Sequence, residues 1–372
     1  MNATQPLIVL AAGGTGGHVF PAEALAESLM ARGRRLALIT DRRGQAFGGV
    51  LGRLDTHRIR AGGIAGRSLW KRGLALIDLG LGTLQAHALL GRMKPAAVVG
   101  FGGYASVPTM LAAILRKRPT LLHEQNAVLG RANRLLAGRV DRIATAFAQV
   151  EHVPTADAKV VPTGMPVRPA VAAMRDTAYP ALDGTGPIAL LVLGGSQGAK
   201  IFSSLIPAAL ALLPETLRRR LRVSQQCRPE LLDETRHTYQ AAGIEADLAS
   251  FFHDVPERLA GAHLVIARAG ASTVAEVSLV GRPAILVPYP HAIDDHQTAN
   301  AHALDEAGGG WLMPEAALSP ASLAARLESL FAHPETLAKA AACARAAGRP
   351  DAAQRLADAV DSLIARTAGG AP

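Results

Sequence analysis

The sequence predicts an α/β protein made of two Rossmann-like, doubly wound parallel-sheet halves. Three observations lead to this prediction: the length of 372 residues, the alternation of short apolar runs with helical patterns, and glycine-rich loops that recur in both halves. A chain of this length exceeds one ordinary α/β core and suits two domains of similar size. Hydrophobic residues make up 49% and charged residues 19%, which excludes a disordered chain.

The first half begins with a predicted strand at residues 7–12, a glycine-rich turn and a predicted helix at 22–31. Further strands of this half are predicted at 35–40, 96–99, 120–123 and 142–144. Continuous apolar runs bounded by glycine, with helical patterns between them, indicate parallel strands that helices cover on both faces.

Residues 162–187 are rich in proline and glycine and predict an interdomain linker at 164–186. The predicted domains are therefore 1–163 and 187–350. The strand pattern restarts after the linker, with strands expected at 188–193, 222–226, 264–267 and 284–287. The tail, 351–372, is helical by composition and has no strand after it, so we expect it to pack back on the N-terminal domain.

Four glycine-rich segments each follow an apolar strand and open a helix. They are residues 13–18, 100–104, 194–198 and 268–273. Glycine lets the backbone approach an anion, and the free N–H groups of a helix start point at it. Ligands of doubly wound sheets lie beyond the carboxyl ends of the strands, where these loops are expected. The pattern predicts a diphosphate ligand held between the domains.

Two other interpretations of these loops stay open. Asp41 ends the second predicted strand, where a dinucleotide-dependent dehydrogenase carries an acidic ribose-binding residue. However, Val19 stands where the third glycine of that fingerprint belongs, and a dehydrogenase gives no reason for the second glycine-rich half. A nucleotide-sugar or dinucleotide sensor without catalytic activity is the other alternative.

Polar side chains beside the loops suggest catalysis on a sugar. His18 stands at a helix start and is the first candidate for acid/base work, although a histidine there also serves as a cap. His123, Glu124, Gln125 and Asn126 end one strand together, which favours a polar substrate. Glu276 is placed to accept hydrogen bonds from ribose hydroxyls, with a surface glutamate as the alternative.

The sequence gives little support for a metal, a nucleic acid or a disulfide framework. Asp294 and Asp295 precede His296, but no DxD motif occurs, so we expect that stretch to bind substrate at a helix N-terminus rather than a metal. The cysteines, Cys227 and Cys343, lie far apart and form no CxxC pattern. Aromatic residues make up only 4%, too few for a base-stacking nucleic-acid surface.

The net charge of +9 and one apolar segment point to an anionic membrane surface. Trp70, Lys71 and Arg72 precede a leucine-rich stretch that includes Leu76 and Ile77, which suits an interfacial patch. A core-facing helix with a basic cap explains the same residues. No stretch is expected to approach the length that spans a bilayer.

These residues together resemble the peptidoglycan family of N-acetylglucosaminyltransferases that act on lipid I. The matching segments are 13–18 with Pro21 and Ala22, 100–106 with Pro108, 123–127 with Gly130 and Asn133, 194–199, 270–276, 288–290, and 294–297 with Asn300 and Ala301. Spread in order over most of the chain, they are far more specific than a single glycine loop.

The resemblance implies the GT-B fold, in which two Rossmann-like domains face each other across a cleft. It implies inverting transfer of N-acetylglucosamine from UDP-N-acetylglucosamine to the muramoyl 4-hydroxyl of lipid I, giving lipid II, with no cofactor and no metal. The N-terminal domain would serve the acceptor and the membrane, and the C-terminal domain the donor. His18 is the expected base, with Glu124 in reserve.

The resemblance also implies a set of donor-binding residues. They are Thr15, Gly16, Gly17, Asn126, Arg168, Ser196, Phe252, Ala271, Ser272, Thr273, Val274, Ala275, Glu276 and Gln297. Two positions depart from the family pattern, because Ala269 replaces a small hydroxyl residue and Phe252 an aliphatic one. We expect a peripheral protein on the cytoplasmic face of the bacterial inner membrane, which contacts other cell-wall synthesis and division proteins.

Overall fold

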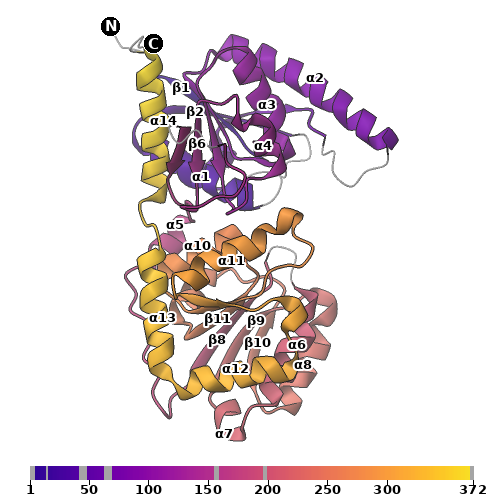
Figure 1. The fold of residues 1–372 in the computed structure, drawn as a ribbon, viewed down its shortest axis with the longest axis vertical. Coiled ribbons are helices and arrows are strands. Elements are labelled where there is room, and N and C mark those ends of the chain that lie inside the picture. Colours follow the sequence, from indigo (N-terminus) through magenta and orange to yellow (C-terminus); the bar gives the residue numbers. More distant parts are fainter. Residues whose placement is uncertain are drawn as a thin grey trace. The chain divides into compact units, whose positions relative to one another are not determined.

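A computed structural model describes residues 5–13, 16–41, 48–62, 69–154, 159–195 and 199–368 (Figure 1). The chain divides into two compact units. Unit 1 runs to Arg168 and takes up the chain again from Asp351, and unit 2 comprises Pro169–Pro350. Each unit holds one parallel sheet, so the predicted pair of doubly wound halves is confirmed.

Unit 1 has seven described strands, which pair in parallel in the order β3-β2-β1-β4-β5-β6-β7. The strands are β1 Leu7–Ala11, β2 Arg35–Asp41, β3 Asp55–Ile59, β4 Ala97–Gly100, β5 Thr120–Glu124, β6 Arg142–Thr145 and β7 Val160–Pro162. The helices are α1 Gly16–Ala31, η1 Leu51–Arg53, α2 Leu69–Met93, α3 Gly103–Leu115, α4 Arg131–Ala137 and α14 Ala352–Ala368. The strand order reverses between β1 and β4.

The two faces of this sheet are buried by different helices. In β1, Ile8 and Leu10 join the cluster that contains α1 and α14, whereas Val9 joins the cluster of α2, α3 and α4. Alternate side chains of a strand point to opposite faces, so a strand covered on both sides is apolar throughout. The C-terminal helix α14, yellow in Figure 1, therefore completes the core of the unit that contains the N-terminus.

Unit 2 has six described strands, again all parallel, in the order β10-β9-β8-β11-β12-β13. They are β8 Ile188–Leu193, β9 Leu221–Gln226, β10 Glu245–Ala249, β11 Leu264–Ala267, β12 Ala284–Leu286 and β13 Gly310–Leu312. The helices are α5 Pro169–Ala172, α6 Lys200–Ala211, α7 Glu215–Arg218, η3 Pro229–Leu231, α8 Leu232–Ala241, α9 Val255–Gly261, α10 Ala271–Val280, η4 Ile293–Asp295, α11 His296–Glu306, η5 Glu315–Ala317, α12 Pro320–Ala332 and α13 Pro334–Ala347. Here the order reverses between β8 and β11.

Most of the segment predicted as a linker, 164–186, is packed as part of unit 2, which begins at Pro169. Arg282, fully buried, donates from Nη2 to the carbonyl of Ala178 at 3.0 Å, and the hydroxyl of Tyr179 donates to the carbonyl of His263 at 2.8 Å. These bonds fasten the proline-rich segment to the body of unit 2.

Candidate functional site

The candidate catalytic site lies in unit 1, where the strand order reverses. β1 and β4 are neighbours, and the chain leaves their carboxyl ends in opposite directions. Ligands of doubly wound sheets bind at this point. His18 stands in the first turn of α1, after β1, and Phe101 follows β4 directly. Topology alone therefore brings these two segments together.

His18 is held by a backbone carbonyl. Its Nδ1 lies 2.8 Å from the carbonyl oxygen of Phe101. A carbonyl only accepts, so Nδ1 carries a proton, and in the neutral ring Nε2 then has an unprotonated lone pair. The Nε2 atom is 3.4 Å from the point where a Cβ on Gly103 would lie. Gly103 has a φ of +68°, so glycine both suits this backbone and leaves room for the ring.

Gln125 binds the same carbonyl. Its Nε2 donates to the Phe101 oxygen at 2.7 Å, and the side chain is only 3% exposed. His123 lies beside it, with its ring centroid 5.8 Å from that of Phe101. Complete burial lowers the pKa of His123 to about 4, so its ring is neutral near pH 7.

The carboxylate of Glu124 accepts hydrogen bonds from the loop that follows it. One carboxylate oxygen accepts from the backbone N–H of Asn126 at 3.0 Å and from its side-chain amide at 3.4 Å. The other accepts from the backbone N–H of Gly130 and from the side chain of Asn133, both at 2.8 Å. A buried carboxylate with four donors organises the loop after β5 and positions Asn126, and its lone pairs are not left for a substrate proton.

Unit 2 offers a backbone anion site at its own reversal point, between β8 and β11. Helix α10 begins after Gly270, whose φ of −65° and ψ of 143° are extended, and no side chain of the described residues caps it. The predicted donor residues Ala271, Ser272 and Thr273 make up its first turn. Their free N–H groups and the helix dipole suit a phosphate. The Ser272 hydroxyl is buried and has no hydrogen-bond partner among the described residues.

The other predicted donor residues of unit 2 occupy varied environments. Val274 and Ala275 continue α10, and Glu276 on the same helix is 8% exposed. Gln297 opens α11, and its Oε1 accepts from the N–H of Tyr289 at 2.9 Å. The ring of Phe252 is buried, with the guanidinium of Arg258 4.1 Å from its centroid.

The remaining predicted positions need separate mention. Thr15 and Ser196 lie outside the described residues. Gly16 and Gly17, which follow Thr15, open α1. Arg168 ends unit 1, where its guanidinium lies 5.3 Å from the ring centroid of Phe20. Asp295 stands at the start of α11, but its carboxylate accepts from the Thr298 hydroxyl at 2.7 Å instead of from a backbone N–H. Among the described residues, no three His, Cys, Asp or Glu side chains gather to hold a metal ion.

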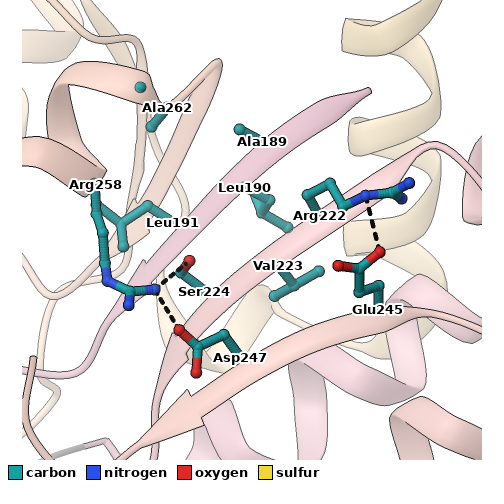
Figure 2. Close-up of a pocket in the computed structure, with 11 residues that line it drawn as sticks. Ala189, Leu190, Leu191, Arg222, Val223, Ser224, Glu245, Asp247, Arg258 and Ala262 are labelled. Atoms are coloured by element: carbon teal, nitrogen blue, oxygen red, sulfur yellow. Dashed lines mark hydrogen bonds and ion pairs between the residues drawn. The ribbon is translucent and has the colours of Figure 1, made fainter. Parts of the chain in front are cut away.

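A separate cavity of about 330 Å³ lies on one sheet face of unit 2, over β8, β9 and β10 (Figure 2). Figure 2 shows Arg258 pointing at Ser224 and Asp247, while Arg222 pairs with Glu245. None of the predicted donor residues lines this cavity. The charged side chains that line the cavity pair with one another. The candidate anion site at the start of α10 lies elsewhere on the unit.

The sequence interpretation missed two groups of the unit 1 site. The first is the Phe101 carbonyl, for which no side-chain pattern gives a signal. The second is Gln125, which stood in the polar string 123–126 but was not singled out. The structure places this string at the end of β5, where three of its four side chains make the hydrogen bonds described above.

Sequence comparisons cover nearly the whole chain. The N-terminal domain of glycosyltransferase family 28 matches residues 8–145, and the C-terminal domain of that family matches residues 189–356. A protein of Paramagnetospirillum magneticum is 65% identical over 99% of this chain and 100% of its own. One from Rhodospirillum rubrum is 62% identical over 97% and 96%. Both are named UDP-N-acetylglucosamine–N-acetylmuramyl-(pentapeptide) pyrophosphoryl-undecaprenol N-acetylglucosamine transferase.

Solved structures agree with the sequence relatives. The crystal structure of Acinetobacter baumannii MurG superposes with a TM-score of 0.78 at 30% identity, over 96% of this chain and 99% of that one. The calicheamicin glycosyltransferase CalG4 gives a TM-score of 0.65 at 17% identity over 99% and 100%. The second likeness shows the fold alone, and both are consistent with the expected GT-B fold.

Proposed function

We propose, from the premise that this chain belongs to glycosyltransferase family 28, that His18 is the base of its transfer reaction. The protein is a GT-B N-acetylglucosaminyltransferase of peptidoglycan synthesis. It moves N-acetylglucosamine from UDP-N-acetylglucosamine to lipid I, the undecaprenyl-diphosphoryl muramoyl-pentapeptide, and so forms lipid II. The observation that carries the base assignment is the 2.8 Å bond from Nδ1 of His18 to the Phe101 carbonyl, which leaves Nε2 free.

The proposed step is a direct displacement with inversion. The muramoyl 4-hydroxyl attacks the anomeric carbon, its proton passes to Nε2 of His18, and the bond to the UDP oxygen breaks. The Phe101 carbonyl then stabilises the resulting imidazolium through the Nδ1–H bond. Glu124 is the weaker candidate, because backbone and amide N–H groups occupy both of its oxygens.

Unit 2 supplies donor binding in this proposal. The N–H groups at the start of α10 receive the diphosphate and stabilise the negative charge that builds on leaving UDP. Glu276 and Gln297 accept hydrogen bonds from ribose and sugar hydroxyls, and Asn126 of unit 1 reaches the donor sugar. The family resemblance supports these assignments, together with the positions of Glu276 on α10 and Gln297 in the first turn of α11.

A coupled assay tests the function. With UDP-N-acetylglucosamine and a soluble lipid I analogue, the protein should release UDP and form the β-linked disaccharide in equal amounts. With either substrate alone, UDP release should fall to background. UDP release that is independent of the acceptor would indicate a hydrolase, and no release with both substrates would favour a sensor.

Helix α2 supports a peripheral membrane location. Contrary to the sequence expectation, Leu74–Met93 is long and apolar enough to cross a membrane, by length and composition only. Yet Ala86 and Leu90 of α2 belong to the core of unit 1, where α2 packs along α3. The rest of the α2 surface exposes Leu76, Ile77 and Leu84, each by more than half.

We therefore propose that this exposed part of α2 lies on the anionic cytoplasmic surface of the inner membrane. Basic residues Arg116 and Lys117 follow α3, and Arg116 reaches the His87 carbonyl at 2.5 Å, which places positive charge beside the C-terminal half of α2. The side chain of Trp70 lies outside the description. The same surface is the proposed meeting place with other cell-wall synthesis and division proteins.

Vesicle flotation tests the membrane surface. A triple variant, Leu76→Ser with Ile77→Ser and Leu84→Ser, should lose most binding to phosphatidylglycerol vesicles while it keeps turnover of a soluble acceptor. Leu212→Ser in unit 2, which removes an equally exposed leucine (59%), is the matched control and should float like the parent protein. Unchanged flotation of the triple variant would contradict the proposal.

A further inference from the structure

The Phe101 carbonyl in unit 1 has two donors, and this shared acceptor is the starting observation. Nδ1 of His18 lies 2.8 Å from the oxygen, and Nε2 of Gln125 lies 2.7 Å from it. A carbonyl oxygen has two lone pairs, so both are in use. The bond to His18 is partly buried, whereas the Gln125 side chain is enclosed.

The peptide that carries this carbonyl has little intrinsic rigidity on its far side. It joins Phe101 to Gly102, whose φ is +78°, and Gly103 follows with a φ of +68°. Glycine has access to many more backbone conformations than other residues, so this turn needs tertiary bonds to hold one orientation. On the near side, the N–H of Phe101 donates to the Ala11 carbonyl of β1 at 3.0 Å. The Gln125 amide is the corresponding tie on the carbonyl side.

We infer that Gln125 is a positioning residue, which pins the Phe101 carbonyl and thereby holds His18 in the tautomer with an unprotonated Nε2. The inference rests on the proposed role of His18 as base. Which ring nitrogen of a histidine carries the proton is set by the hydrogen bond that the other nitrogen makes. If the peptide turned, Nδ1 would lose its acceptor, and Nε2 would carry a proton in part of the molecules.

The surroundings of Gln125 explain why a glutamine suits this place. Its amide nitrogen is also 3.3 Å from both the carbonyl oxygen and the Nδ1 of His123, so one NH₂ group ties the ends of β4 and β5 together. A glutamine carries no charge, so it orients the carbonyl without altering the electrostatics near His18. The neighbouring His123 ring is neutral as well, and the proton that His18 takes up meets no second cation there.

The test compares two buried glutamines. Gln125→Met removes the donor and keeps the chain length. Gln225→Met is the matched control, because Gln225 is also fully buried and donates to a phenylalanine carbonyl, that of Phe202 at 3.0 Å, with no histidine on it. Both proteins are checked by thermal unfolding, since each loses a buried hydrogen bond. The readouts are kcat, the KM for UDP-N-acetylglucosamine, and ¹⁵N spectra of histidine-labelled full-length protein, in which His18→Gln identifies the His18 signals.

We expect the His18 ¹⁵N shifts of Gln125→Met to move from a single Nδ1–H tautomer to a mixture. Its kcat should fall about 10- to 100-fold, by analogy with the loss seen when a hydrogen-bond partner that orients a metal-ligating histidine is removed. The donor KM should change less than about twofold, and Gln225→Met should keep the parent His18 spectrum. A single Nδ1–H tautomer in Gln125→Met, or a kcat within about twofold of the parent, would overturn the inference.

The failure of the base assignment would look different. If His18→Ala kept a near-normal kcat, His18 would not be the base, whatever Gln125 does. The ¹⁵N spectrum of Gln125→Met would still decide whether Gln125 sets the His18 tautomer.

Discussion

The strand order reverses in the same way in the two units, but different chemical groups lie at the two reversal points. In unit 1, between β1 and β4, titratable and amide side chains gather on backbone carbonyls and amides: His18, Gln125 and Glu124. In unit 2, between β8 and β11, a glycine opens α10 and leaves its N–H groups uncapped. In the proposed function, one topology therefore serves proton transfer in one unit and anion binding in the other, because the loops and not the sheet carry the chemistry.

The units also differ in how they bury an ionisable side chain. Unit 1 keeps His123 neutral, since burial lowers its pKa to about 4. Unit 2 buries Arg282, whose guanidinium donates to the carbonyls of Ala260, Val280, Gly281 and Ala178. Burial lowers the pKa of Arg282 too, but an arginine starts so high that it stays charged. Of these two buried groups, only the histidine of unit 1 therefore responds to pH.

The largest expected effect is on catalysis by unit 1. His18→Ala should lower kcat about 10²- to 10⁴-fold, the usual contribution of a general base, with little change in the affinity for UDP. His333→Ala in unit 2 is the control, since His333 is exposed, pairs with Glu335 at 3.3 Å and is not among the predicted site residues. Steady-state kinetics and calorimetry with UDP measure both. An equal loss of kcat in the two variants would contradict the proposal that proton transfer belongs to unit 1 alone.

The next effect concerns the stability of unit 2. Arg282→Met should lower the free energy of unfolding by about 3 kcal/mol, because several buried carbonyls lose their donor and the 177–178 segment loses its tie. Arg220→Met is the matched change at a more exposed arginine, which also donates to carbonyls, those of Gly186 and Asp183. It should cost less than about 1 kcal/mol. Urea unfolding gives both values, and equal costs would contradict the role of burial.

Acid should destabilise unit 1 through His123. The pKa of its ring is about 4 in the folded protein, against 6.5 for an unperturbed histidine in an unfolded chain. Between these values the unfolded chain binds a proton that the folded chain does not, so stability falls as the pH drops from about 6.5 towards 4. The full loss corresponds to about 3 kcal/mol. His123→Phe should flatten this part of the curve in urea titrations from pH 7 to pH 4, and an unchanged slope would exclude His123 as the cause.

The same comparison explains what the sequence could predict of the fold. The interior strands were found because helices cover both faces, which makes them apolar throughout, as in β1 and β8. The edge strands of both sheets, β3, β7, β10 and β13, were missed. β3 reads DTHRI and β10 reads EADLA, with polar residues that keep an edge soluble but hide it from a hydrophobicity pattern.

The site was predictable to the extent that it depends on side chains. The sequence singled out His18, Glu124 and Asn126 as candidates, and the structure brings the loops that hold them to one edge of the sheet. The bond that selects the His18 tautomer was not predictable, because its acceptor is a main-chain carbonyl whose direction depends on the turn at Gly102 and on Gln125, which follows the neighbouring strand β5. Such a contact follows from tertiary structure and leaves no mark in the sequence.

The smallest effect tests the departure at Ala269, beside the anion site of unit 2. The family resemblance leads us to expect a small hydroxyl residue there. Ala269 is fully buried, and its carbonyl accepts from the Asn300 side chain at 3.1 Å, which fixes the backbone before α10. Since the side chain is enclosed, Ala269→Ser should bury a hydroxyl and lower stability by about 1 kcal/mol, with less than about a twofold change in the Kd for UDP. A tenfold gain in UDP affinity would mean that position 269 does reach the diphosphate, and that backbone N–H groups alone do not define the anion site of unit 2.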